Sequence, residues 1–116
     1  MRYFMFVTSD ESAWANSTPQ YKEEIFGKYM AFTMEMQNAG VLLAVESLQP
    51  SSKGSRVQVR NGERTVVDGP WGEPSAVGGY YLIRVDSKDE ALAWAAKCPG
   101  ASYGTMEVRE VSEFGK

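Results

Sequence analysis

Two segments of this sequence are apolar on both faces of a β-strand, and they restrict the possible folds more than any other feature. In Tyr3–Val7 every side chain is apolar or aromatic, so both faces of an extended strand carry such side chains. Gly79–Val85 repeats much of this pattern, with Tyr80 and Tyr81 pointing to opposite faces. A strand that is buried on both sides needs a covering layer on each side. The fold therefore has to provide a covering layer for each face of one sheet.

Two amphipathic helices supply the first covering layer. Apolar residues recur at helical spacing after Thr18-Pro19, which reads as an N-cap followed by proline, and Gly40 ends the pattern. Ser87–Glu90 is a capping box that opens a second helix, and Pro99-Gly100 stops it. The polar, short-sided segment Ser9–Ser17 is expected to be a loop.

Asn61-Gly62 predicts a β-hairpin, because this dipeptide favours the two-residue turn that joins antiparallel strands. Arg56–Arg60 alternates strictly before the turn, and Glu63–Val67 returns after it. A two-residue loop sets Arg60 beside Glu63 and places Val57 opposite Val66, so both charged and apolar side chains pair well.

With further strands at Val41–Leu48 and Gly104–Val111, the order becomes β-α-β, hairpin, β-α-β. We therefore expect residues 1–116 to form one α+β domain, a ferredoxin-like protomer with an inserted hairpin. Its two helices cover only one sheet face, so the second face is expected to pack against another copy in a dimeric α+β barrel. The alternative is a monomer with an aromatic ligand groove on that face.

The chain contains no histidine, which removes Ser-His-Asp and Cys-His catalysis and imidazole metal sites. We expect no metal and no cofactor, since Gly78-Gly79 lacks the context of a phosphate-binding loop. The net charge of −3, without a basic block, argues against direct nucleic-acid binding. The apolar runs are too short to span a membrane, and a single cysteine suits the reducing cytoplasm.

Two carboxylates are candidates for acid–base chemistry. Asp68 opens the loop Asp68–Glu73 at a strand end, where it either acts in function or caps the following backbone. Glu46 lies late in an otherwise apolar strand, and it is either turned inward with a raised pKa or solvated.

The other candidates are for ligand binding. An aromatic pocket is one interpretation of Trp71, Tyr80, Tyr81 and Tyr103, with core or dimer-interface packing as the other. Arg109 and Glu107 share one side of the last strand, where they either bind an anion or form a surface ion pair. Cys98, at a helix C-terminus, is expected to be a buried, unreactive thiol.

Several short motifs, in this order and spacing, resemble the YCII-related proteins, and in particular their branch named for the tetrapeptide DGPF. The matching stretches are Tyr3–Val7, Asp10-Glu11 with Trp14, Ala39-Gly40-Val41-Leu42, Glu46, Leu48-Gln49-Pro50, Asp68-Gly69-Pro70, Glu73, Gly78–Ile83, Val85-Asp86-Ser87, Asp89-Glu90-Ala91, Cys98-Pro99, Gly104 and Glu107-Val108-Arg109. The resemblance implies a ferredoxin-like protomer in a dimeric α+β barrel. The chain departs from the branch at Trp71, where the branch usually has Phe. It also departs at Pro74-Ser75-Ala76, because in the branch charged residues often follow the glutamate.

What the resemblance implies about activity stays open between three hypotheses. The first is a cytoplasmic, dimeric small-molecule-binding protein with its pocket near Asp68–Glu73. The second is a lyase or isomerase that uses Asp68 or Glu46 as acid or base, although the His–Asp pair of enzyme-like relatives is missing here. The third is an accessory protein for extracytoplasmic-function sigma factors, a role associated with other members of the branch.

Overall fold

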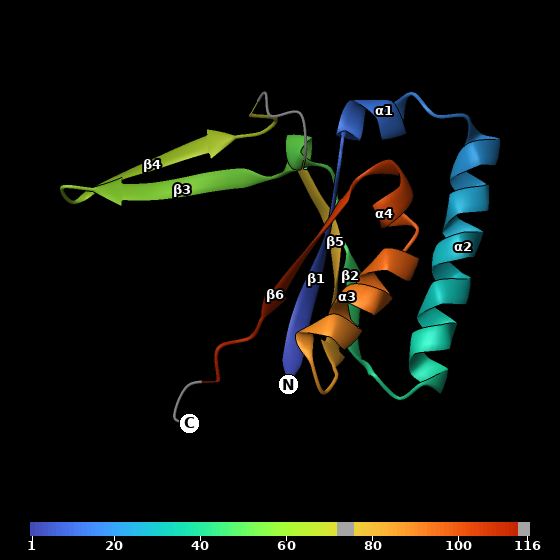
Figure 1. Ribbon diagram of the computed structural model, residues 1–116. Coiled ribbons are helices and arrows are strands. Elements are labelled where there is room, and N and C mark those ends of the chain that lie inside the picture. The colour runs from blue at the N-terminus through green and yellow to red at the C-terminus, as the bar shows by residue number, and fades with distance from the viewer. Residues whose placement is uncertain (72–75, 114–116) are drawn as a thin grey trace.

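Strands and helices follow one another as the sequence predicts, with two short α-helices and one 3-10 helix in addition (Figure 1). The computed structural model describes residues 1–71 and 76–113. Its elements are β1 (Arg2–Ser9), α1 (Glu11–Ala15), α2 (Pro19–Asn38), β2 (Leu42–Ser47), the 3-10 helix η1 (Ser51–Lys53), β3 (Ser55–Arg60), β4 (Glu63–Asp68), β5 (Ala76–Arg84), α3 (Lys88–Lys97), α4 (Gly100–Tyr103) and β6 (Thr105–Glu110).

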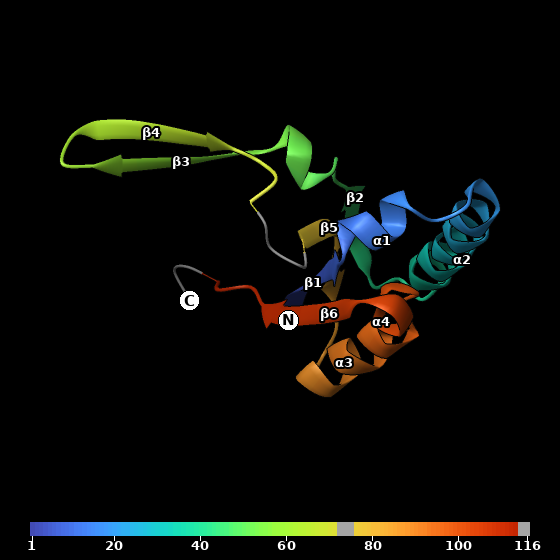
Figure 2. The ribbon, with the colours of Figure 1, turned by 90° about the horizontal axis from the view of Figure 1, so that it is seen from above.

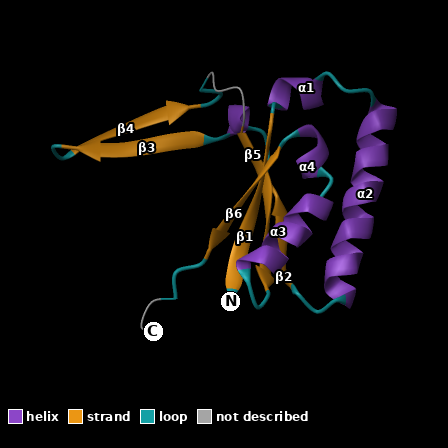
Figure 3. Cartoon of the chain, in the orientation of Figure 1, coloured by secondary structure: helices purple, strands orange, loops and turns teal. Residues whose placement is uncertain are grey.

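A four-stranded sheet with the order β2-β5-β1-β6 forms the centre of the molecule, and all neighbouring strands are antiparallel. The two strands that are apolar on both faces, β1 and β5, lie side by side in the middle of this sheet. The helices cover one face, and the β3–β4 hairpin projects on the other side (Figures 1 and 3). The prediction of an α+β, ferredoxin-like protomer is confirmed.

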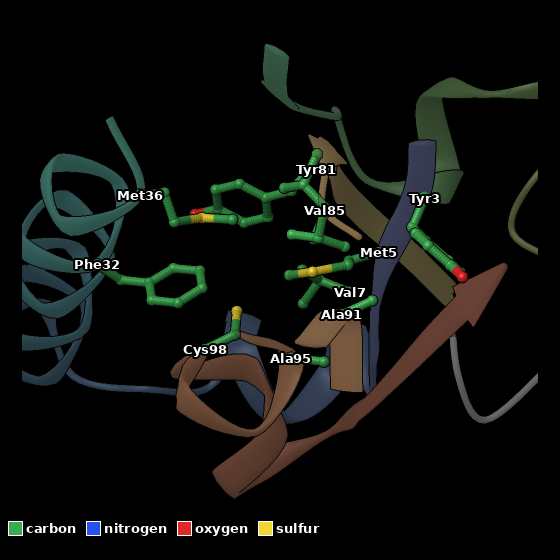
Figure 4. Close-up of a cluster of buried hydrophobic side chains, with 11 residues drawn as sticks. Tyr3, Met5, Val7, Phe32, Met36, Tyr81, Val85, Ala91, Ala95 and Cys98 are labelled. Carbon is green, nitrogen blue, oxygen red and sulfur yellow. The ribbon is translucent and has the colours of Figure 1, made fainter. Parts of the chain in front are cut away.

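The core fills the space between the helices and the sheet. Phe32 and Met36 of α2 point toward Met5 and Tyr81 of the sheet (Figure 4). The rings of Phe32 and Tyr81 meet edge to face with their centroids 5.3 Å apart. Met5, Met36 and Ile83 are completely buried, at 0% exposure, so this face of β1 and β5 is closed within one protomer.

Both long helices begin with the caps that the sequence predicts. Thr18 Oγ1 accepts a hydrogen bond from the Tyr21 backbone N–H at 3.0 Å. Ser87 Oγ accepts one from the Glu90 backbone N–H at 3.2 Å. Gly40 has a φ of +74°, the left-handed conformation that ends a helix on glycine. No helix within residues 1–71 and 76–113 is long and apolar enough to cross a membrane.

The prediction that Ser9–Ser17 is a loop is wrong, because the short helix α1 lies within it. Asp10 is its N-cap and accepts hydrogen bonds from the hydroxyl and the backbone N–H of Ser12. These bonds lower the pKa of the Asp10 carboxyl. The predicted stop at Pro99-Gly100 is confirmed, since α3 ends at Lys97, but the one-turn helix α4 that follows it was not predicted. Both helices are shorter than the apolar repeat from which a helix is recognised in a sequence.

The hairpin has the predicted register, with Arg60 paired to Glu63 and Val57 paired to Val66. Asn61 and Gly62 both have positive φ, at 52° and 80°, as a type I′ turn requires. β3 and β4 form a separate two-stranded sheet, which extends away from the rest of the molecule (Figures 1 and 2).

The sheet face opposite the helices, called the open face here, carries a cluster of aromatic side chains. Phe4 and Phe6 stack with their ring centroids 5.4 Å apart, and Tyr80 meets Phe4 edge to face at 5.5 Å. Leu82 is the strand partner of Phe4 and lies on the same face. All four side chains are half-buried, although the helices are on the other side. β1 and β5 are therefore apolar on both faces, as predicted.

Candidate functional site

A pocket of about 500 Å³ lies where the β3–β4 hairpin leaves the four-stranded sheet. Its lining comes from the connection between β2 and η1, the base of the hairpin and the start of β5, and comprises Leu48, Gln49, Pro50, Ser51, Lys53, Gly54, Arg56, Trp71, Ala76 and Val77. Pockets that hold small molecules have volumes of roughly 300–1,000 Å³ and combine apolar walls with a few polar groups. This pocket, called the hairpin pocket below, has both properties.

Trp71 has the largest side chain among the lining residues of the hairpin pocket. Its indole N–H donates to the Val67 carbonyl at 3.2 Å, which fixes the ring against the end of β4. The Arg56 guanidinium lies over the ring, 4.0 Å from its centroid. Such a stack combines a flat apolar surface with a positive charge. A Cβ atom on Gly54 would lie only 3.2 Å from Trp71 Cη2, so the ring also packs closely on the backbone before β3.

The loop Asp68-Gly69-Pro70 closes the base of the hairpin. The Gly69 N–H donates to the Gly54 carbonyl at 3.0 Å, which extends the pairing of β3 and β4 by one bond. A Cβ atom on Gly69 would lie 2.0 Å from the Ser51 carbonyl oxygen, far inside van der Waals contact. The glycine of this loop is therefore required by the close approach of η1.

Glu11 of α1 holds η1 in place from the other side. One carboxylate oxygen accepts the Ser51 backbone N–H at 2.7 Å, and the other accepts the Ser51 hydroxyl. This pair joins segments that are 40 residues apart. Glu11 and Gln49 were not predicted as site residues, although Asp10-Glu11 and Leu48-Gln49-Pro50 are among the stretches that carry the family resemblance. Lys53 and Arg56 were not predicted either, because they carry no distinguishing pattern in the sequence.

Asp68 lies beside the hairpin pocket and is not among its lining residues. Its carboxylate accepts a hydrogen bond of 2.6 Å from the Ser55 hydroxyl, across the first pair of the hairpin. The side chain is exposed, and this bond gives it a role in closing the hairpin base. Glu73, the other end of the predicted loop, lies outside the described residues.

Glu46, Tyr80 and Arg109 all lie on the open face. Glu46 is exposed and pairs with Tyr80 across β2 and β5, so it is not turned into the protomer's core. Arg109 Nε lies 3.9 Å from the Glu107 carboxylate. Both of these side chains are exposed, so the ion pair contributes little to stability. Within one protomer, these candidates therefore lie on the sheet face away from the helices.

Tyr81 and Tyr103 belong to a group of hydroxyls on the helix side of the sheet. The Tyr103 hydroxyl is hydrogen-bonded to that of Tyr29, and the Tyr81 hydroxyl lies 3.2 Å from Thr33 Oγ1. Burial raises the pKa of Tyr29, Tyr81 and Tyr103, so these phenols stay protonated at neutral pH. Cys98 is buried at 2% exposure as predicted, and burial likewise raises the pKa of its thiol. These groups are suited to structure and hydrogen bonding, and unsuited to act as bases.

The four aromatic candidates are therefore not brought together in one pocket. Trp71 lines the hairpin pocket, Tyr80 lies on the open face, and Tyr81 and Tyr103 lie on the helix side. Among residues 1–71 and 76–113, no three Asp, Glu or Cys side chains lie close enough together to hold a metal ion.

Comparison with known proteins gives a consistent result over nearly the whole chain. The family model described as the YCII-related domain matches residues 1–115. An uncharacterised protein of Rhizobium meliloti strain 1021 is 31% identical over 117 residues, covering 98% of this chain and 94% of the relative.

Proposed function

The chain belongs to the YCII-related family, and from that premise we propose that it is a homodimer that binds a small molecule in the hairpin pocket. Within the family we assign it to the DGPF branch. The close approach of Gly69 to Ser51 supports this assignment, because it gives the glycine of the signature a structural reason. We also place the protein in the cytoplasm, where its single cysteine, Cys98, would stay a free thiol.

The dimer is supported by the open face and by the shape of the protomer. Phe4, Phe6, Tyr80 and Leu82 form an aromatic and aliphatic surface that no helix of the described residues covers. Stacking this face on the same face of a second copy would bury it from both sides, as in a two-layer sheet sandwich. The radius of gyration is 16.3 Å, whereas a compact domain of this length has about 13 Å. Packing two such protomers together would therefore give a more compact particle than the single chain.

The observation that carries the ligand proposal is the pairing of Trp71 and Arg56 in one pocket of about 500 Å³. The indole offers a surface for a flat apolar group. Gln49 and Lys53 add an amide and a second cation to the lining. A small molecule with a planar apolar part and a polar or anionic end fits this combination.

A thermal-shift screen of small aromatic and carboxylic acids tests the ligand proposal, because a ligand that binds only the native state raises the melting temperature. Arg56→Gln removes the charge on the Trp71 ring. Arg60→Gln is a matched control, since Arg60 lies on the same face of β3 but is not in the pocket lining. We expect compounds that stabilise the wild type and Arg60→Gln to lose most of their effect on Arg56→Gln. If no compound stabilises the wild type, or if Arg56→Gln responds like Arg60→Gln, the pocket does not have this function.

A further inference from the structure

Within residues 1–71 and 76–113, the β3–β4 hairpin meets the rest of the protomer at its base, where Arg56 contacts Trp71 and Gly69 contacts Ser51. Its two strands form a sheet of their own, and every residue in both strands is exposed. An isolated two-stranded hairpin is at best marginally stable in water, and such a hairpin becomes stable when a third strand, a helix or another surface packs on it. A hairpin with well-formed register whose strand residues are all exposed therefore points to a partner outside the protomer.

One face of the hairpin has the composition of an interface. Val57, Val59 and Val66 lie on this face, with exposures of 59%, 61% and 46%, beside Arg64, the strand partner of Val59. Gln58 and Thr65 are paired on the opposite face, which is more polar. Monomeric proteins seldom leave a cluster of aliphatic side chains this exposed on a regular element.

The direction of the hairpin indicates which partner it contacts. The hairpin projects from the sheet on the side away from α2 and α3, which is the side of the open face (Figures 1 and 2). A body that covers the open face would therefore lie within its reach. In the proposed homodimer that body is the second copy, and by two-fold symmetry each hairpin would extend along the other protomer.

We infer that the β3–β4 hairpin is an arm that packs its Val57–Val59–Val66 face against a second copy of this chain, an inference that rests on the proposed homodimer. The exposed area supports it quantitatively. The chain exposes 8115 Å². A compact monomer of 12.9 kDa exposes about 6,300 Å². The excess, about 1,800 Å² per chain, is of the size that each subunit of an obligate homodimer buries.

Two charge substitutions on neighbouring residues test the arm. Val57→Glu places a carboxylate on the apolar face, and Gln58→Glu places the same carboxylate one residue along, on the opposite face. Both positions are exposed in the protomer, so circular dichroism should show an unchanged fold for both. We expect Val57→Glu to raise the dimer dissociation constant, measured by analytical ultracentrifugation, by about tenfold or more. Gln58→Glu should leave it within about twofold of the wild type.

A photo-crosslinker identifies what the arm touches. A benzophenone side chain at position 59, in protein mixed with isotopically heavy wild type, should give cross-links to heavy peptides, whereas position 58 should give few. Cross-links from position 59 to its own chain would overturn the arm, because the hairpin would then fold back on its own protomer.

A wild-type dimer with equal dissociation constants for Val57→Glu and Gln58→Glu would also overturn the arm, while leaving the proposed homodimer intact. A wild-type chain that stays monomeric would overturn both. The two failures are therefore distinguishable.

Discussion

The carbonyl oxygen of Ser51 lies 2.0 Å from the position that a Cβ atom would take on Gly69. This contact brings the signature loop against η1, and Glu11 fixes η1 from the opposite side through the Ser51 N–H at 2.7 Å. The base of the hairpin and one wall of the hairpin pocket thus depend on the same three segments, which are the signature loop, η1 and α1. Substitutions in these segments should affect both the hairpin base and the pocket.

Gly69→Ala is expected to lower the free energy of unfolding by about 1–3 kcal/mol, because the new methyl group forces η1 and the loop apart. Gly27→Ala is the matched control. Gly27 lies on α2 with no atom within 4 Å of its would-be Cβ, and alanine there should stabilise the helix by about 0.5–1 kcal/mol. Urea denaturation measures both changes. Equal effects at the two positions would contradict the close approach of Gly69 to Ser51.

Gly62→Val is expected to loosen the hairpin and to leave the core unchanged. Gly62 has a φ of +80°, a conformation that costs a β-branched residue about 1–2 kcal/mol. Because β3 and β4 make a separate sheet, amide hydrogen exchange should rise in residues 55–68, by about tenfold for each 1.4 kcal/mol lost, and stay constant in β1 and β5. Unchanged exchange throughout the hairpin would show that its turn is not of this type.

Asp68→Asn is expected to fold like the wild type, since an amide oxygen still accepts the hydrogen bond from Ser55. Asp68→Ala and Ser55→Ala should each cost about 0.5–1.5 kcal/mol, and the double substitution should cost little more than either alone. Denaturation of the four proteins gives this cycle. If Asp68→Asn folds normally but loses the ligand response of the thermal-shift screen, the carboxylate serves the ligand and not only Ser55.

Stability is expected to fall at alkaline pH because of the half-buried phenol of Tyr29. Burial, with the hydrogen bond to Tyr103, raises the pKa of Tyr29 in the folded state. Above the ordinary tyrosine pKa of about 10, the unfolded chain releases this proton and the folded chain retains it. The free energy of unfolding therefore decreases as pH rises above about 10. Below this pH, the contribution of Tyr29 to the free energy of unfolding is constant. Denaturation between pH ~8 and ~11 should show the decline, and Tyr29→Phe should make it shallower. An equally steep decline in Tyr29→Phe would contradict this.

Most of the fold could be predicted from local patterns. The hairpin register follows from Asn61-Gly62, and the helix starts follow from Thr18-Pro19 and Ser87–Glu90, because turns and caps depend on a few adjacent residues. The sheet order follows from two βαβ halves. The helices α1 and α4 could not be predicted, since five and four residues are too few to show helical periodicity.

The candidate site was less predictable because it is made by contacts between distant segments. Trp71 could be chosen as a bulky residue in a signature loop. Its partner Arg56 is one of two arginines on an alternating strand, and the sequence does not distinguish it from Arg60. Glu11 reaches Ser51 across 40 residues of chain. Tyr80 and Tyr81 are adjacent in the sequence and point to opposite faces of β5, so they could not share a pocket within one protomer.

The molar mass of the wild-type chain in solution tests the central claim, the homodimer, most directly. Multi-angle light scattering on protein eluting from a sizing column should give about twice the chain mass of 12.9 kDa at micromolar concentration, as a closed two-fold assembly requires. A constant mass equal to one chain, from the lowest to the highest concentration, would contradict the account: the open face and the hairpin arm would then have no second copy to cover them.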